Sequence, residues 1–289
     1  MKNILVPTDF SEHADYATEV AAEIARKSGA TLYIYHIINI PVQEENYRYQ
    51  QFQSIPEALF MIKLAEKNFA TLLKKPYLKG VKVINAIDFA SIYDRITKLA
   101  KKHKIDLIVM GSHGTSGFRE EFIGTNTERV ARIAHCPVLT IKQQHKKFEI
   151  RNIVFASNFY KETDHVVPRV RQFAELFGAN VHLLKVNTPY HFETNRYAHK
   201  LMEDMAKKHK IKHYSINMYN DEHIENGLLN FSDDTNADLI AIGTHGRTGL
   251  SHLINGSLAE DVINHAHRPV LTIKIKEPKV KFGTIAPIK

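Results

Sequence analysis

The sequence predicts an α/β protein made of two tandem doubly wound domains, and three observations support this fold class. A glycine pattern, in which Gly111 and Gly114 are followed after nine further residues by Gly124, occurs again 132 residues along the chain. Each half alternates short β-branched runs with amphipathic stretches, which is typical of βαβ units on a parallel sheet. The length of 289 residues also agrees with two domains of roughly 150 residues each.

The internal repeat covers most of the chain. Residues 2–11 align with residues 151–160 at an offset of 149, and residues 137–142 align with residues 269–274 at an offset of 132. The second half has therefore lost 17 residues between its second and third strands. A period of this size is that of a domain rather than of a solenoid repeat. The predicted units are residues 1–145, residues 146–275 and a basic tail at residues 276–289.

Five β-branched runs predict the strands of the first half, and two end signals frame its first helix. This helix begins after Ser11, a favoured N-cap, and ends at Gly29, with apolar residues at helical spacing between them. The corresponding helix of the second half ends at Gly178. Right-handed crossovers between parallel strands then place helices on both faces of the sheet. The predicted strands are residues 4–7, 31–37, 81–87, 107–110 and 138–142.

An insert at residues 38–80 separates the second and third strands of the first half. It contains a predicted helix over residues 56–73 and several aromatic residues. We expect these aromatic side chains to cover a sheet edge or an interface between the domains, and a lid across a binding site is the alternative. They are Tyr47, Tyr49, Phe52 and Phe60.

Half of the net charge of +8 lies at one end, because residues 274–289 hold five lysines and one glutamate. Neither half contains a basic helix with interleaved aromatic residues, which argues against sequence-specific nucleic-acid binding. No apolar run approaches the roughly 18 residues that span a bilayer, and the amino end lacks a signal-peptide profile, so a cytoplasmic protein is expected. The single cysteine, Cys136, excludes an intrachain disulfide and lies just before a strand, where packing is its expected role.

A hydroxyl residue followed three positions later by glutamate marks the last glycine of each pattern. Thr125 and Glu128 in the first half, like residues 257 and 260 in the second, match the capping box that begins a helix. A helix amino terminus carries unpaired N–H groups and a positive dipole end, which suit a phosphate. Asp9, just after the first strand, can accept hydrogen bonds from a ribose or an adenine amino group. The pattern predicts a mononucleotide site, and the alternative is that the glycines only shape tight turns.

These motifs resemble those of the universal stress protein family, here as a tandem of two domains. The resemblance rests on the pattern G-x2-G-x9-G-[S/T], on Pro-Thr-Asp-Phe-Ser at the end of the first strand, and on Cys-Pro-Val-Leu or Arg-Pro-Val-Leu at the entry to the last strand. It covers nearly all of residues 1–274. The resemblance implies a Rossmann-like, five-stranded parallel sheet of order 3-2-1-4-5 in each half, with the two domains paired through their last strands. It also implies a stress-response protein of an ATP-binding subclass that acts in sensing or signalling.

The resemblance carries nucleotide-binding positions over to both halves. In the first half they are Pro7, Thr8, Asp9, Ile37, Met110, Gly111, Gly114, Gly124, Thr125 and Asn126. In the second half they are Ala156, Ser157, Asn158, Val186, Ile242, Gly243, Gly246, Gly256, Ser257 and Leu258. Asn158 stands where the family has aspartate, which removes a negative charge and adds a donor. The second half therefore binds nucleotide more weakly, differently or not at all, and these alternatives stay open. The implied ligand is ATP, and two further points stay open: whether Mg²⁺ accompanies it, and whether AMP or ADP binds instead of ATP.

Two other function classes stand beside nucleotide binding. The sequence contains no P-loop, no nucleophile elbow and no H-E-x-x-H motif, which argues against the common enzymes that use them. Slow Mg²⁺-dependent ATP hydrolysis stays open, with no catalytic residue assigned. The 17 histidines form no recognised ligand set, so no metal site is expected. The other class is an interaction module with one or both pockets empty, and a homodimer of the whole chain also stays open.

Overall fold

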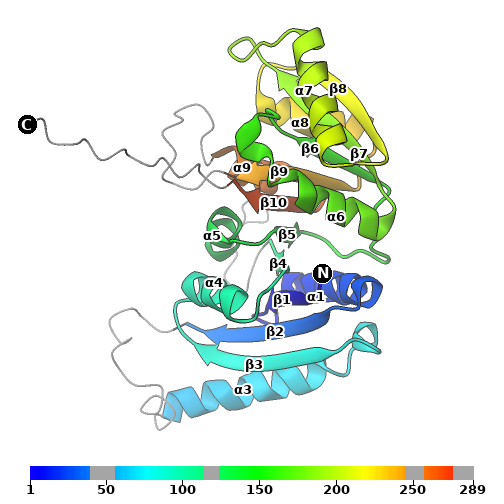
Figure 1. Cartoon of the computed structure of the whole chain (residues 1–289). Coiled ribbons are helices and arrows are strands. Elements are labelled where there is room, and N and C mark those ends of the chain that lie inside the picture. The colour runs from blue at the N-terminus through cyan, green and yellow to red at the C-terminus, as the bar shows by residue number, and fades with distance from the viewer. Residues whose placement is uncertain (40–55, 113–123, 245–256, 276–289) are drawn as a thin grey trace, which may run out of the picture.

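The computed structural model describes residues 1–39, 56–112, 124–244 and 257–275. Strands and helices alternate along both halves of the chain, and the described strands form one continuous sheet (Figure 1). The α/β class predicted from the sequence is therefore confirmed. Three predicted site residues, Gly114, Gly246 and Gly256, lie outside the described residues.

The strands and α-helices of the two halves follow one another in the same order, whereas the short 3₁₀ helices, labelled η, lie at different places. The first half contains β1 (Asn3–Pro7), α1 (Glu12–Ser28), β2 (Thr31–Ile38), α3 (Pro56–Leu72), η2 (Pro76–Leu78), β3 (Val83–Phe89), α4 (Ile92–Lys102), β4 (Leu107–Gly111), α5 (Thr125–Ile133) and β5 (Val138–Ile141). The second half contains β6 (Asn152–Ala156), η3 (Lys161–Thr163), α6 (Val167–Phe177), β7 (Asn180–Asn187), α7 (Asn195–Lys208), β8 (Tyr214–Asn220), α8 (Ile224–Asp234), β9 (Leu239–Thr244), α9 (Ser257–His265) and β10 (Val270–Lys274).

The ten strands lie in the order β3-β2-β1-β4-β5-β10-β9-β6-β7-β8. Each half therefore has the order 3-2-1-4-5 when its own strands are numbered from one to five. All pairs within a half are parallel, whereas β5 and β10 pair antiparallel, with Leu139 opposite Leu271. Because the direction reverses at this junction, the carboxyl ends of the strands on its two sides point to opposite edges of the sheet.

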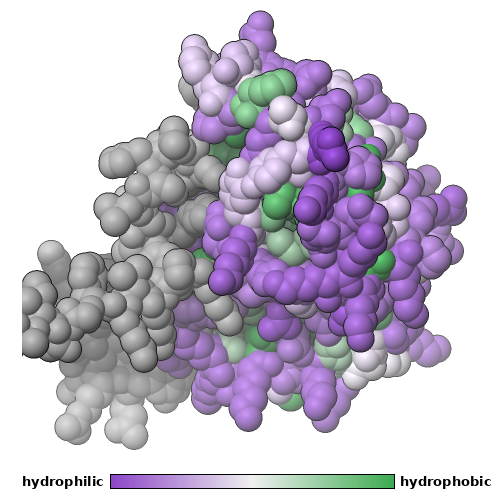
Figure 2. Space-filling model, turned by 45° about the horizontal axis from the view of Figure 1, so that its top comes forward, coloured by the Kyte–Doolittle hydropathy of each residue, from purple (hydrophilic) through white to green (hydrophobic). Residues whose placement is uncertain are grey.

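Helices cover both faces of the sheet. One buried cluster unites residues of α1, α3, α6 and α7, and the other unites residues of α4, α5, α8 and α9. Phe148 and Ile150, in the connection between the halves, belong to the first cluster, so the core continues across the junction. On the face in Figure 2 hydrophilic side chains predominate and apolar ones are scattered, as amphipathic helices require.

The ends of the first helix are those that the sequence predicts. The hydroxyl of Ser11 accepts a hydrogen bond from the Ala14 N–H at 3.3 Å, and Gly29 ends the helix with a φ of 69°. Gly178 ends α6 in the same left-handed conformation. However, α6 begins only at Val167, because Tyr160 replaces the capping serine and Pro168 cannot continue a helix toward earlier residues.

Two predictions for the insert need correction. The third strand begins at Val83 rather than at residue 81, because the Val81 N–H bonds back to the Leu78 carbonyl in the preceding turn. Helix α3 lies along β3 at the end of the sheet, but Phe60 is 68% exposed and does not cover that edge (Figure 1). Tyr47, Tyr49 and Phe52 lie outside the described residues.

The junction between the halves predicts a pH-dependent contribution to stability. Lys142, just after β5, donates a hydrogen bond to the Asn264 carbonyl of α9, and burial lowers the pKa of its ammonium group from 10.5 to about 8. The unfolded chain therefore binds more protons between these two values, so the stability cost of burying the charged amine is present in full below about pH 8 and falls as the pH rises through that window. We expect the unfolding free energy of wild type minus that of Lys142→Met to rise between pH 7.5 and 9.5 in denaturant titrations. A constant difference would contradict the assignment.

Candidate functional site

The candidate site lies where the strand order of the first half reverses. β1 and β4 are neighbours, with Ile4 opposite Leu107, while β2 and β3 lie on one side and β5 on the other. Doubly wound sheets bind ligands outside the carboxyl ends of strands at such a switch point. The pairing brings Pro7 and Gly111, the last residues of these strands, to the same end of the sheet.

Two side chains shape the turn that follows β1. The Thr8 hydroxyl accepts a hydrogen bond from the Phe10 N–H at 3.0 Å, and an Asp9 carboxylate oxygen accepts one from the Ser11 N–H at 3.0 Å. Phe10 between them has a φ of 64°, a conformation that a bulky residue rarely adopts. The His36 ring donates to the Thr8 carbonyl at 2.8 Å, which ties this turn to β2.

The second half repeats this turn at the end of β6. The Ser157 hydroxyl accepts from the Phe159 N–H at 3.1 Å, and the Asn158 oxygen accepts from the Tyr160 N–H at 3.1 Å. Phe159 has a φ of 58°, close to that of Phe10. Sequence analysis missed both strained residues, because only glycine signals a left-handed conformation with any strength. The one available signal was a phenylalanine at the same place in each half.

Close packing explains the glycine at the end of β4. A β-carbon on Gly111 would lie 2.7 Å from the carbonyl carbon and oxygen of His13, in the first turn of α1. The equivalent Gly243 would instead meet the side-chain end of Ile275, at 2.8 Å. Neither glycine has a positive φ. Close packing against α1 therefore explains the glycine at position 111 without a ligand.

Helix α5 begins beside this strand end without the predicted capping box. Gly124 is the N-cap, with a φ of −62°, and no side chain bonds to the helix start there. The Thr127 hydroxyl donates to the Gly111 carbonyl at 2.9 Å, and the Gly124 N–H donates to the Ser112 carbonyl at 2.7 Å. The first turn is thus fixed to β4. The first N–H groups that bond within the helix are those of Thr127 and Glu128, both to the Gly124 carbonyl. The N–H groups of residues 125 and 126 therefore have no acceptor within the helix, and the positive dipole end lies at the switch point.

Several predicted nucleotide contacts are core residues beneath the strand ends. Ile37 and Met110 are 7% and 6% exposed and belong to one buried cluster. In the second half, Val186 and Ile242 occupy the same cluster. Val186 is packed so closely against α8 that a β-carbon on Gly227 would lie 2.6 Å from its side chain. Of the other predicted positions, Ala156 ends β6, and Ser257 and Leu258 begin α9.

The second half differs from the first in how its polar groups are used. The Asn158 amide donates to the Glu162 carboxylate at 3.0 Å, so both ends of this amide are engaged within the chain. Tyr160, at the position of Ser11, donates its hydroxyl to Glu193. This hydrogen bond is the main cause, and burial the second, of a Tyr160 pKa raised to about 12.

A buried ion pair lies beside Tyr160. The Lys185 ammonium group is 2.7 Å from the Glu193 carboxylate, with side-chain exposures of 9% and 16%. Burial alone would raise the pKa of Glu193, but hydrogen bonds from Lys185 and Tyr160 hold it below its usual value. Lys185 occupies the place of His36 in the first half. Sequence analysis missed this pair, and its one signal was a lysine within the apolar run of β7.

Other features of the described residues bear on the function classes. The described residues contain no group of three or more histidine, cysteine or acidic side chains placed to hold a metal ion. No helix among them combines the length and apolar character needed to cross a membrane. Burial raises the pKa of the Cys136 thiol to about 12, which keeps it protonated and suits a packing role.

Comparisons with known proteins identify the family. The profile described as "Universal stress protein family" matches residues 1–142 and again residues 149–274. Universal stress protein Slr1230 of Synechocystis sp. is 24% identical over 95% of this chain and 100% of its own length. Universal stress protein MJ0531 of Methanocaldococcus jannaschii is 29% identical over 50% of this chain and 85% of its own. A crystal structure of a universal stress protein from Archaeoglobus fulgidus has a TM-score of 0.73 at 21% identity, covering 95% of this chain and 97% of that one.

The two strand-end glycines provide a matched pair of substitutions. In Gly111→Ala the new methyl group meets backbone atoms of His13, so α1 must shift, and we expect a loss of about 1–3 kcal/mol of unfolding free energy. In Gly243→Ala it meets the flexible end of Ile275, so a smaller loss is expected. Urea titrations of both variants measure the difference. Equal losses would contradict this explanation of Gly111.

Proposed function

The chain belongs to the universal stress protein family as a tandem of two family domains, and from this premise we propose that its first half binds an adenine nucleotide. ATP is the proposed ligand, with or without Mg²⁺, and AMP and ADP are alternatives. The role proposed for the bound nucleotide is sensing or signalling within the stress response. For such a role the nucleotide must prefer one conformation of the protein over another. The cytoplasmic location expected from the sequence is part of the same proposal.

The observation that carries the proposal is the uncapped start of α5 at the switch point of the first half of the sheet. Gly124 places no side chain there, and the first turn is anchored to β4 through Thr127. A nucleotide phosphate would accept hydrogen bonds from the N–H groups of residues 125 and 126. Asp9, in the turn after β1, would accept hydrogen bonds from the ribose or adenine. The start of α5 thus offers hydrogen-bond donors to a phosphate, and the neighbouring strand end offers a carboxylate acceptor to the nucleoside. Together they suit the two parts of a mononucleotide.

The same reasoning assigns the nucleotide to the first half only. In the second half, Asn158 is bonded to Glu162, and Tyr160 is bonded to Glu193 at the equivalent turn. The helix that follows begins at Val167 instead of at the position equivalent to Glu12. These internal contacts use the groups that would face adenosine. We therefore propose that the second half binds no nucleotide and acts through its surface, as an interaction module does.

Weak ATP hydrolysis is the other candidate function. It would require a positioned water and a base near the terminal phosphate. We assign no residue to the role of base, so nucleotide binding is the function proposed. Release of phosphate that depends on Mg²⁺ and is lost together with binding in the variants below would favour hydrolysis.

The stoichiometry of nucleotide binding tests the proposal. We expect about one adenine nucleotide per chain, either released on denaturation of the purified protein or bound after addition of ATP and Mg²⁺. In Gly124→Val a side chain would stand where phosphate approaches the helix, and its φ of −62° suits valine. We expect binding at least about tenfold weaker, since hydrogen bonds to charged groups contribute about 1.5–3 kcal/mol each. Calorimetric titration measures the affinity.

Gly256→Val is the matched control for this experiment, because it changes the equivalent glycine of the second half. We expect it to leave the affinity and the stoichiometry unchanged. Two nucleotides per chain, or equal losses in the two variants, would contradict the assignment to the first half. No nucleotide under either condition would contradict the proposal as a whole.

Restoring the family aspartate tests why the second half differs. In Asn158→Asp the new carboxylate would face that of Glu162, which now accepts from the Asn158 amide at 3.0 Å. We therefore expect no gain in nucleotide binding, together with a loss of stability that Asn158→Asp with Glu162→Gln reverses. Stoichiometry from calorimetry and unfolding in urea measure the two effects. A second bound nucleotide in the single variant would show that the missing charge alone closes this half.

A further inference from the structure

Strand β3 has a free edge, because it lies at the end of the sheet order. The Leu32 N–H bonds to the Lys82 carbonyl, and the Ala90 N–H bonds to the Ile38 carbonyl. In a parallel ladder, alternate residues of a strand bond to the same neighbour, so the even-numbered residues from 82 to 90 face β2. The N–H and C=O groups of Val83, Asn85 and Ile87 therefore point outward, where no described residue pairs with them.

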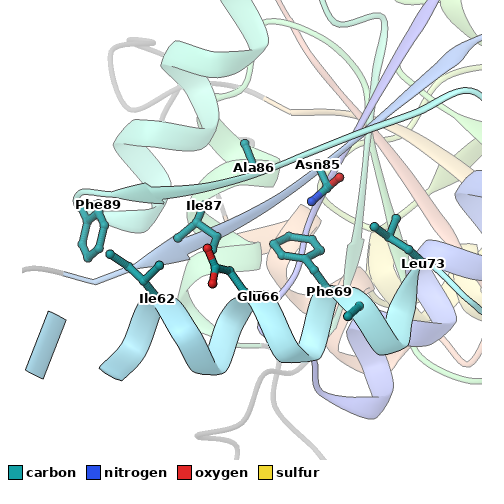
Figure 3. A pocket seen from close by; sticks show the side chains of 9 residues that line it. Ile62, Glu66, Phe69, Leu73, Asn85, Ala86, Ile87 and Phe89 are labelled. Atoms are coloured by element: carbon teal, nitrogen blue, oxygen red, sulfur yellow. The ribbon is translucent and has the colours of Figure 1, made fainter. Parts of the chain in front are cut away.

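A groove runs along this edge between β3 and α3. Figure 3 shows the side chains of Asn85, Ile87 and Phe89 directed toward the helix. The side chains of Ile62 and Phe69 on the helix point toward the strand. The groove has a volume of about 480 Å³, and most of its lining is apolar. Leu73 at one end is 41% exposed, so this apolar surface is open to solvent. The lining residues are Ile62, Glu66, Phe69, Ala70, Leu73, Asn85, Ala86, Ile87 and Phe89.

An unpaired strand edge beside a helix-lined groove has the geometry that accepts an added strand. The main chain of an extended segment bonds to the edge, and alternate side chains enter the groove. Here the outward backbone groups and the groove-facing side chains belong to the same odd-numbered residues of β3. An added strand would therefore place every second side chain over α3. The segment that fits has apolar residues at every second position.

We propose that residues 279–284 from the C-terminal tail of a second copy of this chain add to β3 as a strand. Val280, Phe282 and Thr284 alternate with Lys279 and Lys281, which is the pattern of a strand with one apolar face. The apolar face would enter the groove and the lysines would face away from α3. Charge favours the approach of the tail at longer range rather than by a direct ion pair, because residues 274–289 carry five lysines and one glutamate and the one charged lining residue, Glu66, is acidic.

The tail of the same chain cannot reach this position. β10 and β3 are five steps apart in the sheet and an added strand would lie one step further, which makes about 29 Å at about 4.8 Å per step. Only four residue steps separate Ile275, the last described residue, from Lys279, and they span at most about 14 Å. The donor is therefore a second copy, and two copies that exchange tails would close as a dimer.

The test measures binding of a fluorescent peptide with the sequence of residues 276–289 to the full chain and to the chain truncated after Ile275. We expect saturable binding by anisotropy, tighter to the truncated chain because it has no tail to compete. Light scattering of the full chain should show a mass that rises with concentration toward two copies, and the truncated chain should stay at one. Absence of peptide binding to the truncated chain, or a dimer that survives truncation, would overturn the proposal.

Two pairs of variants separate strand addition from other modes of association. Asn85→Pro removes an outward N–H without touching the bonds to β2, and we expect at least about threefold weaker peptide binding, whereas Asn85→Ala removes the same side chain but keeps the N–H and should lose less. Leu73→Glu, in the groove, should weaken binding, and Leu64→Glu, exposed but outside the groove lining, should not. Circular dichroism confirms that each variant is folded. Equal binding by both members of either pair would overturn the proposal.

Discussion

The antiparallel pairing of β5 with β10 is the interaction on which the rest of the molecule depends. Each of these strands would otherwise be an open edge of a five-stranded sheet, and both are apolar and almost entirely buried. Open apolar edges invite association with other chains. By meeting each other, the two last strands satisfy their main-chain groups and join the cores of the halves. Phe148 and Ile150 extend that core along the connection between them.

The repeat gives both halves the same scaffold, yet the strand ends have become different. The turn after the first strand keeps its hydrogen bonds and its left-handed phenylalanine in both halves, so this part is a property of the scaffold. What changes is the surrounding chemistry, in which His36 is replaced by Lys185 and Ser11 by Tyr160. The first half keeps a capped helix and an uncapped α5 near its strand ends. The second half ties its equivalent groups to Glu162 and Glu193.

Much of the architecture could be predicted from the sequence because its signals are local. β-branched runs, the cap at Ser11 and the terminal glycines of α1 and α6 act within a few residues. The capping box at Thr125 failed because Gly124, one residue earlier, is the N-cap: the Gly124 carbonyl accepts from the Glu128 N–H, and the Glu128 carboxylate pairs with Arg132. The Lys185 and Glu193 pair, and the contact of Gly111 with His13, depend on segments that only the fold brings together. The sequence predicted that the ends of the first and fourth strands are neighbours, and they are, but the contacts of individual residues there could not be obtained from spacing alone.

Covalent fusion of two similar domains also removes a constraint that binds every symmetric dimer. In a dimer of identical chains, each substitution appears on both sides of the axis, so a contact that suits one side must be accepted on the other. Here Lys142 reaches the Asn264 carbonyl across the interface, while the carbonyl of its counterpart Lys274 accepts a hydrogen bond from the His165 ring within its own half. A single gene product can thus change one side of its interface independently, and each half is free to specialise.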